Sequence, residues 1–552
     1  MRMKWSCFAL MLAGSWLGKG APAAAGDVSR SPEFLRGRLL YAQHCLICHM
    51  GTGLGQPGTY PPLAGSDFLL ADRARAISVI CDGLSGPIKV NGVEYNNSMP
   101  PIIINDQQVA DVLTFVLNSW GSQAAPFTAD EVAAVRRTAR FKTYEELAAA
   151  ASYRALPPAP AGFTLREVAR LNEFPVRIAG SFDGSRLFVL STDGKVLDVE
   201  TMTGKTTQLL EAADYADLSL GSPQTLGLTV GPDQHLYLTS NQRHEAVTPV
   251  MNEVRIFRSA ETIATLPPKM NVWFATNYPF GIGPYNHGVS HLAFGPDGMV
   301  YVASGSRTDG NEPGTDPRYS KAGETPITAG LWRLDPATTP PTMKMHARGL
   351  RNVYGFAWDG DGRLFSVSNG PDAHSPEELD HVVAGAHYGF PYRFADWQTK
   401  PYPHTPEPPP GLEFKLPVAN LGPAAGGSTD RPMFTFDPHS SPAGMVWLDE
   451  RWPPAYQNSF LVTRFGNLLA RDPDVGFDVL RVKLLPQPDG SWTAETHSML
   501  APLGRPIDIF IQRGALYIAE YTRPTDLKGG IGWLPGRIIE LKPSGAGLRA
   551  FE

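Results

Sequence analysis

Cysteine is scarce in this chain of 552 residues, with four in total: Cys7, Cys45, Cys48 and Cys81. So few cysteines exclude a fold that is held together by a network of disulfides. Long apolar runs are also missing, since no stretch reaches the about 20 apolar residues that a membrane-spanning helix needs. The formal net charge of -6 shows no excess of positive charge, so the chain has no general attraction to nucleic acid.

Glycine and proline, by contrast, are abundant, with 55 and 51 residues. This composition favours many turns and short strands over helical bundles. Hydrophobic residues make up 42% of the chain, which is enough for packed cores. A chain of this length is too long for one ordinary domain, so we expect at least two.

The first 25 residues have the pattern of a secretory signal peptide. Arg2 and Lys4 precede an apolar core over residues 5–17, and residues 21–25 are small enough for cleavage. Removal of this segment takes away three positive charges and no negative ones, so the formal net charge changes from -6 to -9. We therefore expect a periplasmic or secreted protein that has no membrane span.

Residues 45–49 are Cys-Leu-Ile-Cys-His, the attachment signature of c-type haem. One helical turn presents Cys45 and Cys48 to the two haem vinyl groups, and His49 follows as a ligand for the iron. The alternatives are a redox dithiol or half of a zinc site. A zinc site needs a second pair of ligands, and Cys81 is the one cysteine that follows. The motif predicts a single covalent haem c.

Met99 is the candidate for the sixth iron ligand, because a thioether opposite a histidine suits electron transfer. Residues 31–122 resemble a class I cytochrome c, a small all-α domain, and residues 60–65, Tyr-Pro-Pro-Leu-Ala-Gly, look like its haem-packing loop. We predict a first helix over 34–44 and a last helix from Asn105 to Gly121 that crosses it. Cys81 is expected to be a small buried hydrophobe, with a reactive thiol as the alternative.

Residues 123–160 are predicted to be a connector with helical pieces and a proline-rich end. From residue 161 the pattern changes to a repeat of apolar strand, polar turn and second strand. The six repeats centre on residues 185–196, 225–238, 292–302, 355–365, 444–462 and 507–518. They predict an all-β six-bladed β-propeller over residues 161–545, closed by pairing of residues 537–541 with an N-terminal strand.

Three long stretches lack a clear strand pattern: residues 239–286, 303–328 and 388–438. Long loops on a rigid scaffold commonly carry function. The alternative is that they cover the edges of the blades.

Three motifs carry a second resemblance. Residues 349–358 are Gly-Leu-Arg-Asn-Val-Tyr-Gly-Phe-Ala-Trp, residues 368–372 are Ser-Asn-Gly-Pro-Asp, and residues 388–391 are Tyr-Gly-Phe-Pro. Together they resemble the glucose/sorbosone dehydrogenase family, six-bladed quinoproteins that bind pyrroloquinoline quinone (PQQ) and calcium. A cofactor with three carboxylates and an ortho-quinone needs arginines, a cation at the quinone oxygens and a base for the substrate proton.

The resemblance assigns these roles to particular residues. His287 matches the catalytic base, although a lone loop histidine is more often structural, as we expect for the nearby His291. Arg351 and Asn352 match the pair that contacts the quinone, and Arg351 would stabilise developing negative charge. Gly370 and Pro371 match the residues whose main-chain carbonyl oxygens bind calcium in that family.

Arg464 and Arg505 match positions that contact PQQ, although the soluble glucose enzymes have lysine at the first and a second arginine two residues from the second. That departure weakens an assignment to glucose. Gln224 and His439 are candidate substrate contacts, and His439 could equally belong to the scaffold.

Glu378 and Asp380 could hold a second, structural calcium. The alternative is a solvated acidic turn.

Together these features predict a secreted quinohaemoprotein dehydrogenase that oxidises a sugar, a polyol or a hydroxy-aldehyde. Electrons would pass from PQQ through haem c to an external acceptor such as another cytochrome or a terminal oxidase. One alternative is a non-catalytic propeller that docks a redox partner for the cytochrome. The other is a propeller hydrolase or lactonase, which would need a metal held by side-chain carboxylates.

Overall fold

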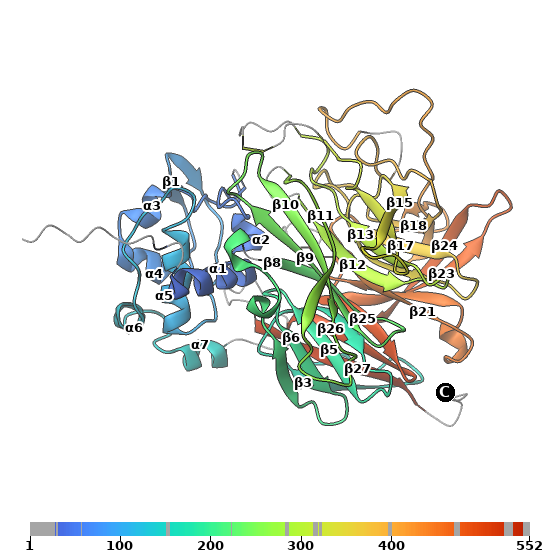
Figure 1. Cartoon of the computed structure of the whole chain (residues 1–552), viewed down its shortest axis with the longest axis horizontal. Helices are drawn as coiled ribbons and strands as arrows, with labels where there is room; N and C mark the ends of the chain where they lie inside the picture. Colours follow the sequence, from blue (N-terminus) through green and yellow to red (C-terminus); the bar gives the residue numbers. More distant parts are fainter. Residues whose placement is uncertain are drawn as a thin grey trace, which may run out of the picture.

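The computed structural model describes residues 28, 31–56, 58–150, 155–221, 223–281, 286–312, 318–319, 323–395, 400–467, 475–523 and 534–544. The predicted signal peptide, residues 1–25, lies outside these ranges. A small helical domain lies beside a larger domain of strands (Figure 1). Among the described residues, none of the helices has the length and apolar character needed to cross a membrane.

The helical domain is built on two crossing helices. Its helices and those of the connector are α1 (Pro32–His44), α2 (Leu46–His49), α3 (Asp67–Leu70), α4 (Arg73–Asp82), α5 (Asp106–Val116), α6 (Ala129–Arg136) and α7 (Tyr144–Ala150), with a hairpin of β1 (Ile88–Val90) and β2 (Val93–Tyr95). The predicted crossing of α1 and α5 is confirmed. Gly37 of α1 lies directly on the Asp111 carbonyl, where a Cβ atom would overlap it. The crossing therefore requires glycine.

Helix α5 begins at the predicted place but ends earlier than predicted. Asn105 caps it, and Asn105 and Gln108 exchange the two hydrogen bonds of a capping box. The last helical residue is Val116, not a residue near Gly121. Trp120 has a positive φ of 51°, and its ring turns back to pack on Tyr41 and Phe115. The tryptophan thus caps the core and does not extend the helix.

The first helical piece of the connector is α6, which ends at Arg136. The Arg136 side chain is buried and donates to Asp106 at 2.5 Å and to the Ile104 carbonyl at 3.0 Å. Helix α6 therefore packs against the helical domain.

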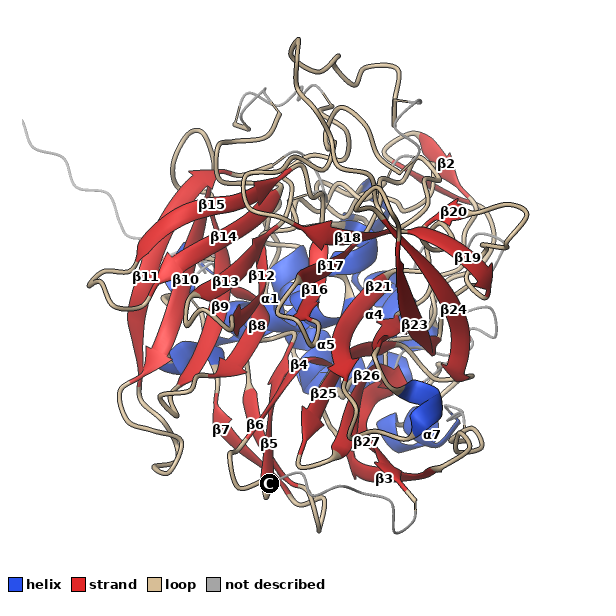
Figure 2. Cartoon of the chain, turned by 90° about the vertical axis from the view of Figure 1, so that its right-hand side faces the viewer, coloured by secondary structure: helices blue, strands red, loops and turns tan. Residues whose placement is uncertain are grey.

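Within the described residues, the strands of the larger domain form six sheets around a common centre (Figure 2). The first three are β4 (Pro175–Gly180), β5 (Arg186–Ser191), β6 (Val196–Glu200) and β7 (Thr206–Leu210); β8 (Pro223–Val230), β9 (Leu236–His244), β10 (Met251–Ser259) and β11 (Met270–Pro279); and β12 (Val289–Phe294), β13 (Val300–Ser304), β14 (Gly330–Asp335) and β15 (Thr342–Arg348). The predicted six-bladed propeller is confirmed.

The remaining three blades are less regular. They are β16 (Val353–Trp358), β17 (Leu364–Ser368) and β18 (Glu378–Val382); β21 (Pro442–Leu448), β22 (Ser459–Arg464), β23 (Asp478–Pro486) and β24 (Trp492–Leu500), extended by β19 (Ala419–Pro423) and β20 (Met433–Phe434); and β25 (Pro506–Gln512), β26 (Ala515–Arg523), β27 (Leu534–Pro543) and β3 (Phe163–Arg170). In the described chain, the fourth blade has three strands and the fifth has six.

The ring closes as predicted, because β27 pairs antiparallel with β3 from the other end of the domain. Five of the predicted repeats are the first two strands of a blade. The first repeat is different, since residues 185–196 form β5 and β6, and the inner strand β4 was missed. Arg177 in the middle of β4 interrupts its apolar pattern. Its guanidinium is buried and pairs with Asp508 at 3.0 Å.

One predicted loop is wrong. Residues 239–286 contain most of β9 together with β10 and β11, the outer strands of the second blade. Their exposed faces carry polar residues, which hid the strand pattern. The stretches 303–328 and 388–438 are mainly irregular where the structure describes them, although the second contains the short strands β19 and β20.

The helical domain covers one face of the propeller. Figure 1 shows it at one end of the molecule, and in Figure 2 α1 and α5 lie behind the ring of strands. The covered face is the one at which the inner strands begin, since α1 contacts residues next to β4 and β8. Segments that precede the inner strands are therefore brought toward the helical domain.

Arg537 ties three strands of the closing blade, because it contacts Glu520 of β26 at 2.6 Å and Glu167 of β3 at 3.1 Å. The Arg537 side chain is 4% exposed and that of Glu520 is fully buried. Replacement of Arg537 by Met leaves a buried carboxylate unpaired, so we expect urea unfolding to show a loss of about 3–5 kcal/mol. Lys205→Met is the control. That side chain is 70% exposed, and we expect a loss of about 0–1 kcal/mol. Equal losses in the two variants would contradict the closing role.

Candidate functional site

The Cys-Leu-Ile-Cys-His motif lies where α1 passes into α2. Cys45 is both the C-cap of α1 and the N-cap of α2. Cys45 and Cys48 are free thiols and are partly exposed. The tight turn brings Cys45 and Cys48 to one side of the chain, since the Cys48 backbone nitrogen donates to the Cys45 carbonyl at 3.2 Å. This geometry fits attachment to two neighbouring vinyl groups.

His49 is oriented for metal binding. Its Nδ1 lies 3.0 Å from the Pro61 carbonyl oxygen, so Nδ1 carries the proton and Nε2 has the lone pair for iron. Pro61 belongs to the predicted haem-packing loop. Burial lowers the pKa of His49, which also favours the neutral ligand form. Met99 is partly buried and its backbone pairs with Leu84 at 2.7 Å in both directions; its role as the sixth ligand stays a prediction.

Cys81 is fully buried in the core of the helical domain. Burial raises the pKa of its thiol to about 11. A thiol that stays protonated and inaccessible is a small hydrophobe, as predicted, and not a reactive nucleophile.

On the propeller, His287 lies just before the inner strand β12. Its Nδ1 is 3.3 Å from both the carbonyl and the hydroxyl oxygen of Ser306. The Ser306 hydroxyl donates its own proton to the Thr308 carbonyl at 2.8 Å. Both oxygens are therefore acceptors toward His287, so Nδ1 carries the proton and Nε2 has the lone pair. His287 is set up to accept a proton at Nε2.

Asn241 of β9 positions the segment that carries His287. Its buried amide accepts from the Val289 nitrogen at 2.7 Å and donates to the Val289 carbonyl at 2.8 Å. It also donates to the Gln224 carbonyl at 3.3 Å, which links the starts of β8 and β12. The predicted substrate contact Gln224 thus lies at the same end of the propeller as His287.

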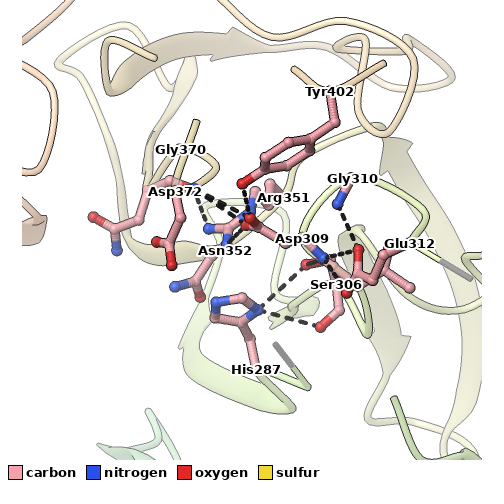
Figure 3. A network of polar contacts seen from close by, with 12 residues as sticks. His287, Ser306, Asp309, Gly310, Glu312, Arg351, Asn352, Gly370, Asp372 and Tyr402 are labelled. Carbon is pink, nitrogen blue, oxygen red and sulfur yellow. Dashed lines mark hydrogen bonds and ion pairs between the residues drawn. The ribbon is translucent and has the colours of Figure 1, made fainter. Parts of the chain in front are cut away.

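Arg351 is the centre of a buried polar cluster beside His287 (Figure 3). It forms an ion pair with Asp309 and donates to the Asn369 carbonyl at 3.0 Å. Tyr402 donates its hydroxyl to Asp309, and the Asp372 backbone nitrogen approaches the same carboxylate at 3.2 Å. The Ser306 nitrogen donates to the Arg351 carbonyl at 2.7 Å, which joins this cluster to the histidine.

Two polar atoms in this cluster point to a ligand. Arg351 Nε and Asn369 Oδ1 are buried, and within the described residues no hydrogen bond satisfies them. Such atoms are costly in a closed core and are expected where a polar ligand binds. The side chain of Asn352, the second predicted quinone contact, points toward the His287 ring in Figure 3.

Gly370 and Pro371 follow directly after Asn369. The Gly370 nitrogen donates to the Glu377 carboxylate, and in the described chain no hydrogen bond ends on the carbonyl oxygen of either residue. Burial raises the pKa of Glu377 to about 7, against hydrogen bonds from Gly370, Ser441 and His439 that lower it. Two open carbonyl oxygens beside a buried acid are suited to a hard cation.

Glu378 and Asp380 are not in a solvated turn, so that alternative is wrong. They lie two residues apart on β18, on one face of the strand, and both are fully buried. Glu378 Oε1 accepts from the Ala395 nitrogen at 2.7 Å, but Glu378 Oε2 and both Asp380 oxygens lack a hydrogen-bond partner among the described residues. Burial raises the pKa of both carboxyl groups well above the ordinary range.

The two predicted PQQ arginines differ in their surroundings. Arg464 forms a bidentate pair with Asp478, at 2.8 and 2.7 Å, and contacts Asp437 at 2.9 Å. A cofactor carboxylate would have to compete with these two aspartates. Arg505 donates to the carbonyls of Gly466 and Asn467 at 3.3 and 3.1 Å and lies over two phenyl rings. Neither role is tested by these contacts.

His439 and His291 are placed differently. His439 has a left-handed backbone, with a φ of 63°, and its Nε2 lies 3.1 Å from Nδ1 of His374. It lies next to the segment that contacts Glu377, so it borders the cluster. His291 packs on the Phe356 ring at 4.6 Å, and burial lowers its pKa well below the ordinary range, in line with the structural role predicted for it.

Sequence reasoning missed the residues that hold Arg351 and His287 in place. Asp309 and Ser306 lie in the irregular stretch 303–328, and Tyr402 lies in 388–438. A polar residue in a loop carries no periodic signal, so the available signal was the length of the two loops. Among the described residues, there is no group of three or more His, Cys, Asp or Glu side chains that could hold a metal by themselves.

Comparison with known proteins follows the same division of the chain. The family model described as Glucose / Sorbosone dehydrogenase matches residues 172–472, and that for Cytochrome c matches residues 34–120. Cytochrome c-552 of Thermus thermophilus is 38% identical over 110 residues, which are 18% of this chain and 83% of that protein. The cytochrome c subunit of a quinone alcohol dehydrogenase from Gluconobacter oxydans is 31% identical over 107 residues, 18% of this chain and 22% of that protein.

Solved structures similar to this chain include the PQQ-bound aldose sugar dehydrogenase of Streptomyces coelicolor. It is 22% identical, has a TM-score of 0.46, and the match covers 70% of this chain and 99% of that one. The apo form of the soluble aldose sugar dehydrogenase of Escherichia coli is 14% identical, with a TM-score of 0.47, over 69% of this chain and 100% of that one.

The glucose/sorbosone dehydrogenase match spans more than half of the chain, and the cytochrome match spans the helical domain that carries the haem motif. The chain therefore belongs to the glucose/sorbosone dehydrogenase family and carries a cytochrome c domain on the N-terminal side of its propeller.

Proposed function

We propose that this oxidoreductase is a secreted quinohaemoprotein dehydrogenase of a sugar, polyol or hydroxy-aldehyde. The observation that carries the proposal is the His287–Ser306–Arg351 cluster. It holds a histidine whose Nδ1 contacts place the lone pair on Nε2, beside a buried arginine and two unsatisfied polar atoms. The predicted signal peptide supports a periplasmic or extracellular location.

His287 is the base in this proposal. Its Nε2 takes the proton of the substrate hydroxyl while the C–H bond of the same carbon breaks, which leaves a carbonyl product. Ser306 holds the imidazole through Nδ1, so the ring keeps its tautomer as the proton arrives at Nε2. When bound, PQQ supplies an ortho-quinone that accepts the hydride.

Arg351 and Asn352 would hold that cofactor at its quinone. Arg351 is already paired with Asp309, so it places a hydrogen-bond donor at the site without adding a net charge. The unsatisfied Arg351 Nε supplies a donor toward negative charge. Arg505 is our candidate for a cofactor carboxylate, and Arg464 is a second one that shares its charge with Asp437 and Asp478.

Calcium is proposed at the carbonyl oxygens of Gly370 and Pro371, where it would polarise the quinone. A second calcium is proposed at Glu378 and Asp380, whose three unsatisfied oxygens need either protons or a cation.

Two electrons leave each substrate molecule, whereas one haem iron accepts one electron at a time. When bound, the haem would supply a one-electron carrier with His49 and Met99 as its proposed iron ligands, so the proposal needs an external one-electron acceptor that is used twice per turnover. The two protons go to solvent. The rival hypothesis of a redox-docking propeller predicts no binding of PQQ and no oxidation of substrate.

Replacement of His287 by Ala tests the proposed base. We expect substrate-dependent haem reduction to fall by about 10²–10⁴-fold, because general-base catalysis contributes about that factor. PQQ should stay bound, as measured by its absorbance after gel filtration. The control is His497→Ala, an exposed histidine of β24, which should keep the full rate. An unchanged rate in His287→Ala would remove His287 from the mechanism.

The dependence of the unfolding free energy on pH and on calcium tests the calcium site proposed at β18. The pKa values of Glu378 and Asp380 are raised in the folded state above their ordinary values of 4.5 and 3.8. Without calcium, their contribution to stability is therefore fully present below these ordinary values, and stability falls as the pH rises above them. Calcium should restore about 2.7 kcal/mol at 100 times its Kd. Urea unfolding at a series of pH values, with chelator and with calcium, measures both effects.

The matched variant Glu378→Gln/Asp380→Asn keeps the shape of both side chains but cannot ionise. We expect calcium no longer to stabilise this variant through β18. Its stability should also no longer fall as the pH rises. A response to calcium equal to that of the wild-type chain would place the stabilising ion elsewhere.

A further inference from the structure

The haem motif of the cytochrome domain faces the propeller. His44, the residue before Cys45, stacks edge-on against Phe174 of the propeller, with ring centroids 5.3 Å apart. Arg505, one of the proposed PQQ arginines, lies within range of an electrostatic interaction with Cys48. The two cofactor sites of the chain are therefore on facing surfaces.

Two arginines anchor this contact from opposite sides. Arg38 of α1 donates to the Leu218 carbonyl just before β8, and burial lowers its pKa although Glu245 raises it. Arg243 of β9 reaches in the other direction, and a Cβ atom on Gly51 would lie 3.2 Å from its Nη1. Arg243 also pairs with Glu245 at 3.1 Å, so the anchor is a cross-domain charge cluster.

Aromatic rings continue from the contact into the propeller. Phe174 lies 5.2 Å from Tyr521, and Tyr521 lies 5.5 Å from Phe465, measured between ring centroids. The guanidinium of Arg505 lies 5.1 Å from the centroid of Phe465. Together with His44, these rings form an unbroken packed path, the aromatic bridge: His44, Phe174, Tyr521 and Phe465.

The inner end of the aromatic bridge borders the candidate active site. The Phe465 nitrogen donates to the Ser441 carbonyl at 2.9 Å. Ser441 in turn contacts the buried Glu377, which accepts from the Gly370 nitrogen. A series of ring contacts and hydrogen bonds therefore runs from the haem motif to the proposed calcium ligands.

Electron transfer between cofactors slows steeply as the gap between them grows, so a fixed short contact matters more than a tether alone. We propose that the cytochrome domain stays docked on the active-site face, and that Arg38 and the aromatic bridge position it to take electrons from the propeller. This rests on the proposed function. Each of the two electrons of the reduced PQQ reduces ferric haem to ferrous haem, and an external one-electron oxidant then reoxidises the iron.

Arg38→Glu and Phe174→Ala test this docking in the full chain. Arg38→Glu puts a carboxylate against the Leu218 carbonyl and Glu245, and Phe174→Ala removes the partner ring of His44. Aromatic contacts and charge-assisted hydrogen bonds each shift an equilibrium by about tenfold. We expect haem reduction after rapid mixing with substrate to slow by about tenfold in each variant, while PQQ reduction, followed by its own absorbance, keeps its rate.

Arg137→Glu is the matched control, because it makes the same charge change at an exposed arginine at the end of α6. It should reduce haem at the wild-type rate. A second readout needs neither PQQ nor substrate: amide hydrogen exchange of residues 34–50 and 217–221 should speed up in Arg38→Glu and Phe174→Ala, but not in Arg137→Glu.

Wild-type haem reduction in both interface variants would overturn the docking proposal. Failure of the proposed function gives a different result, since no substrate would then reduce PQQ in the wild-type chain. In that case the exchange measurement still decides whether Arg38 and Phe174 hold the domains together, and unchanged exchange in both variants would also overturn the proposal.

Discussion

A single buried arginine at the centre of the propeller holds its inner strands in register. Arg177 of β4 pairs with Asp508 of β25, donates to the Leu226 carbonyl of β8 at 2.9 Å, and donates to the Tyr354 carbonyl of β16. Inner strands that converge on an axis leave carbonyl groups that need donors, and a guanidinium can supply five. The buried cation requires its carboxylate, so four blades are fixed around one ion pair. The segments before β16 and β25, which carry Arg351 and Arg505, take their positions from it.

The same arginine shows the limit of sequence reasoning in this chain. Alternating apolar residues and Pro-Asp turns predicted six blades and the closure of β27 on β3, because these patterns reflect burial on a period of two. Strand β4 was not predicted because of Arg177. In a sequence, a buried arginine cannot be distinguished from an exposed one when its partner is 331 positions away. The polar outer strands β10 and β11 were taken for a loop for the related reason that their exposed faces lack an apolar signal.

The site was predictable in part for similar reasons. Residues 45–49 form a local motif, so the sequence alone specified the haem attachment and the orientation needed at His49. His287 and Arg351 were found through family motifs, whereas Asp309, Ser306 and Tyr402 were not, because their role depends on loops that fold back from distant positions. Burial of Glu378 and Asp380 was likewise invisible, since an acidic pair in a sequence is usually solvated.

The fourth blade, as far as the structure describes it, has three strands, and its outer strand β18 therefore has an edge without a neighbouring strand of its own sheet. Irregular chain covers that edge, with the Val418 nitrogen donating to the Leu379 carbonyl at 2.8 Å and the Thr435 hydroxyl accepting from the Leu379 nitrogen at 2.8 Å. A loop that replaces a strand can change length without altering the register of the ring. Residues 406–416, which are exposed or partly exposed, can therefore change in length at little cost to the scaffold, whereas Tyr402 and the buried residues on either side of them cannot.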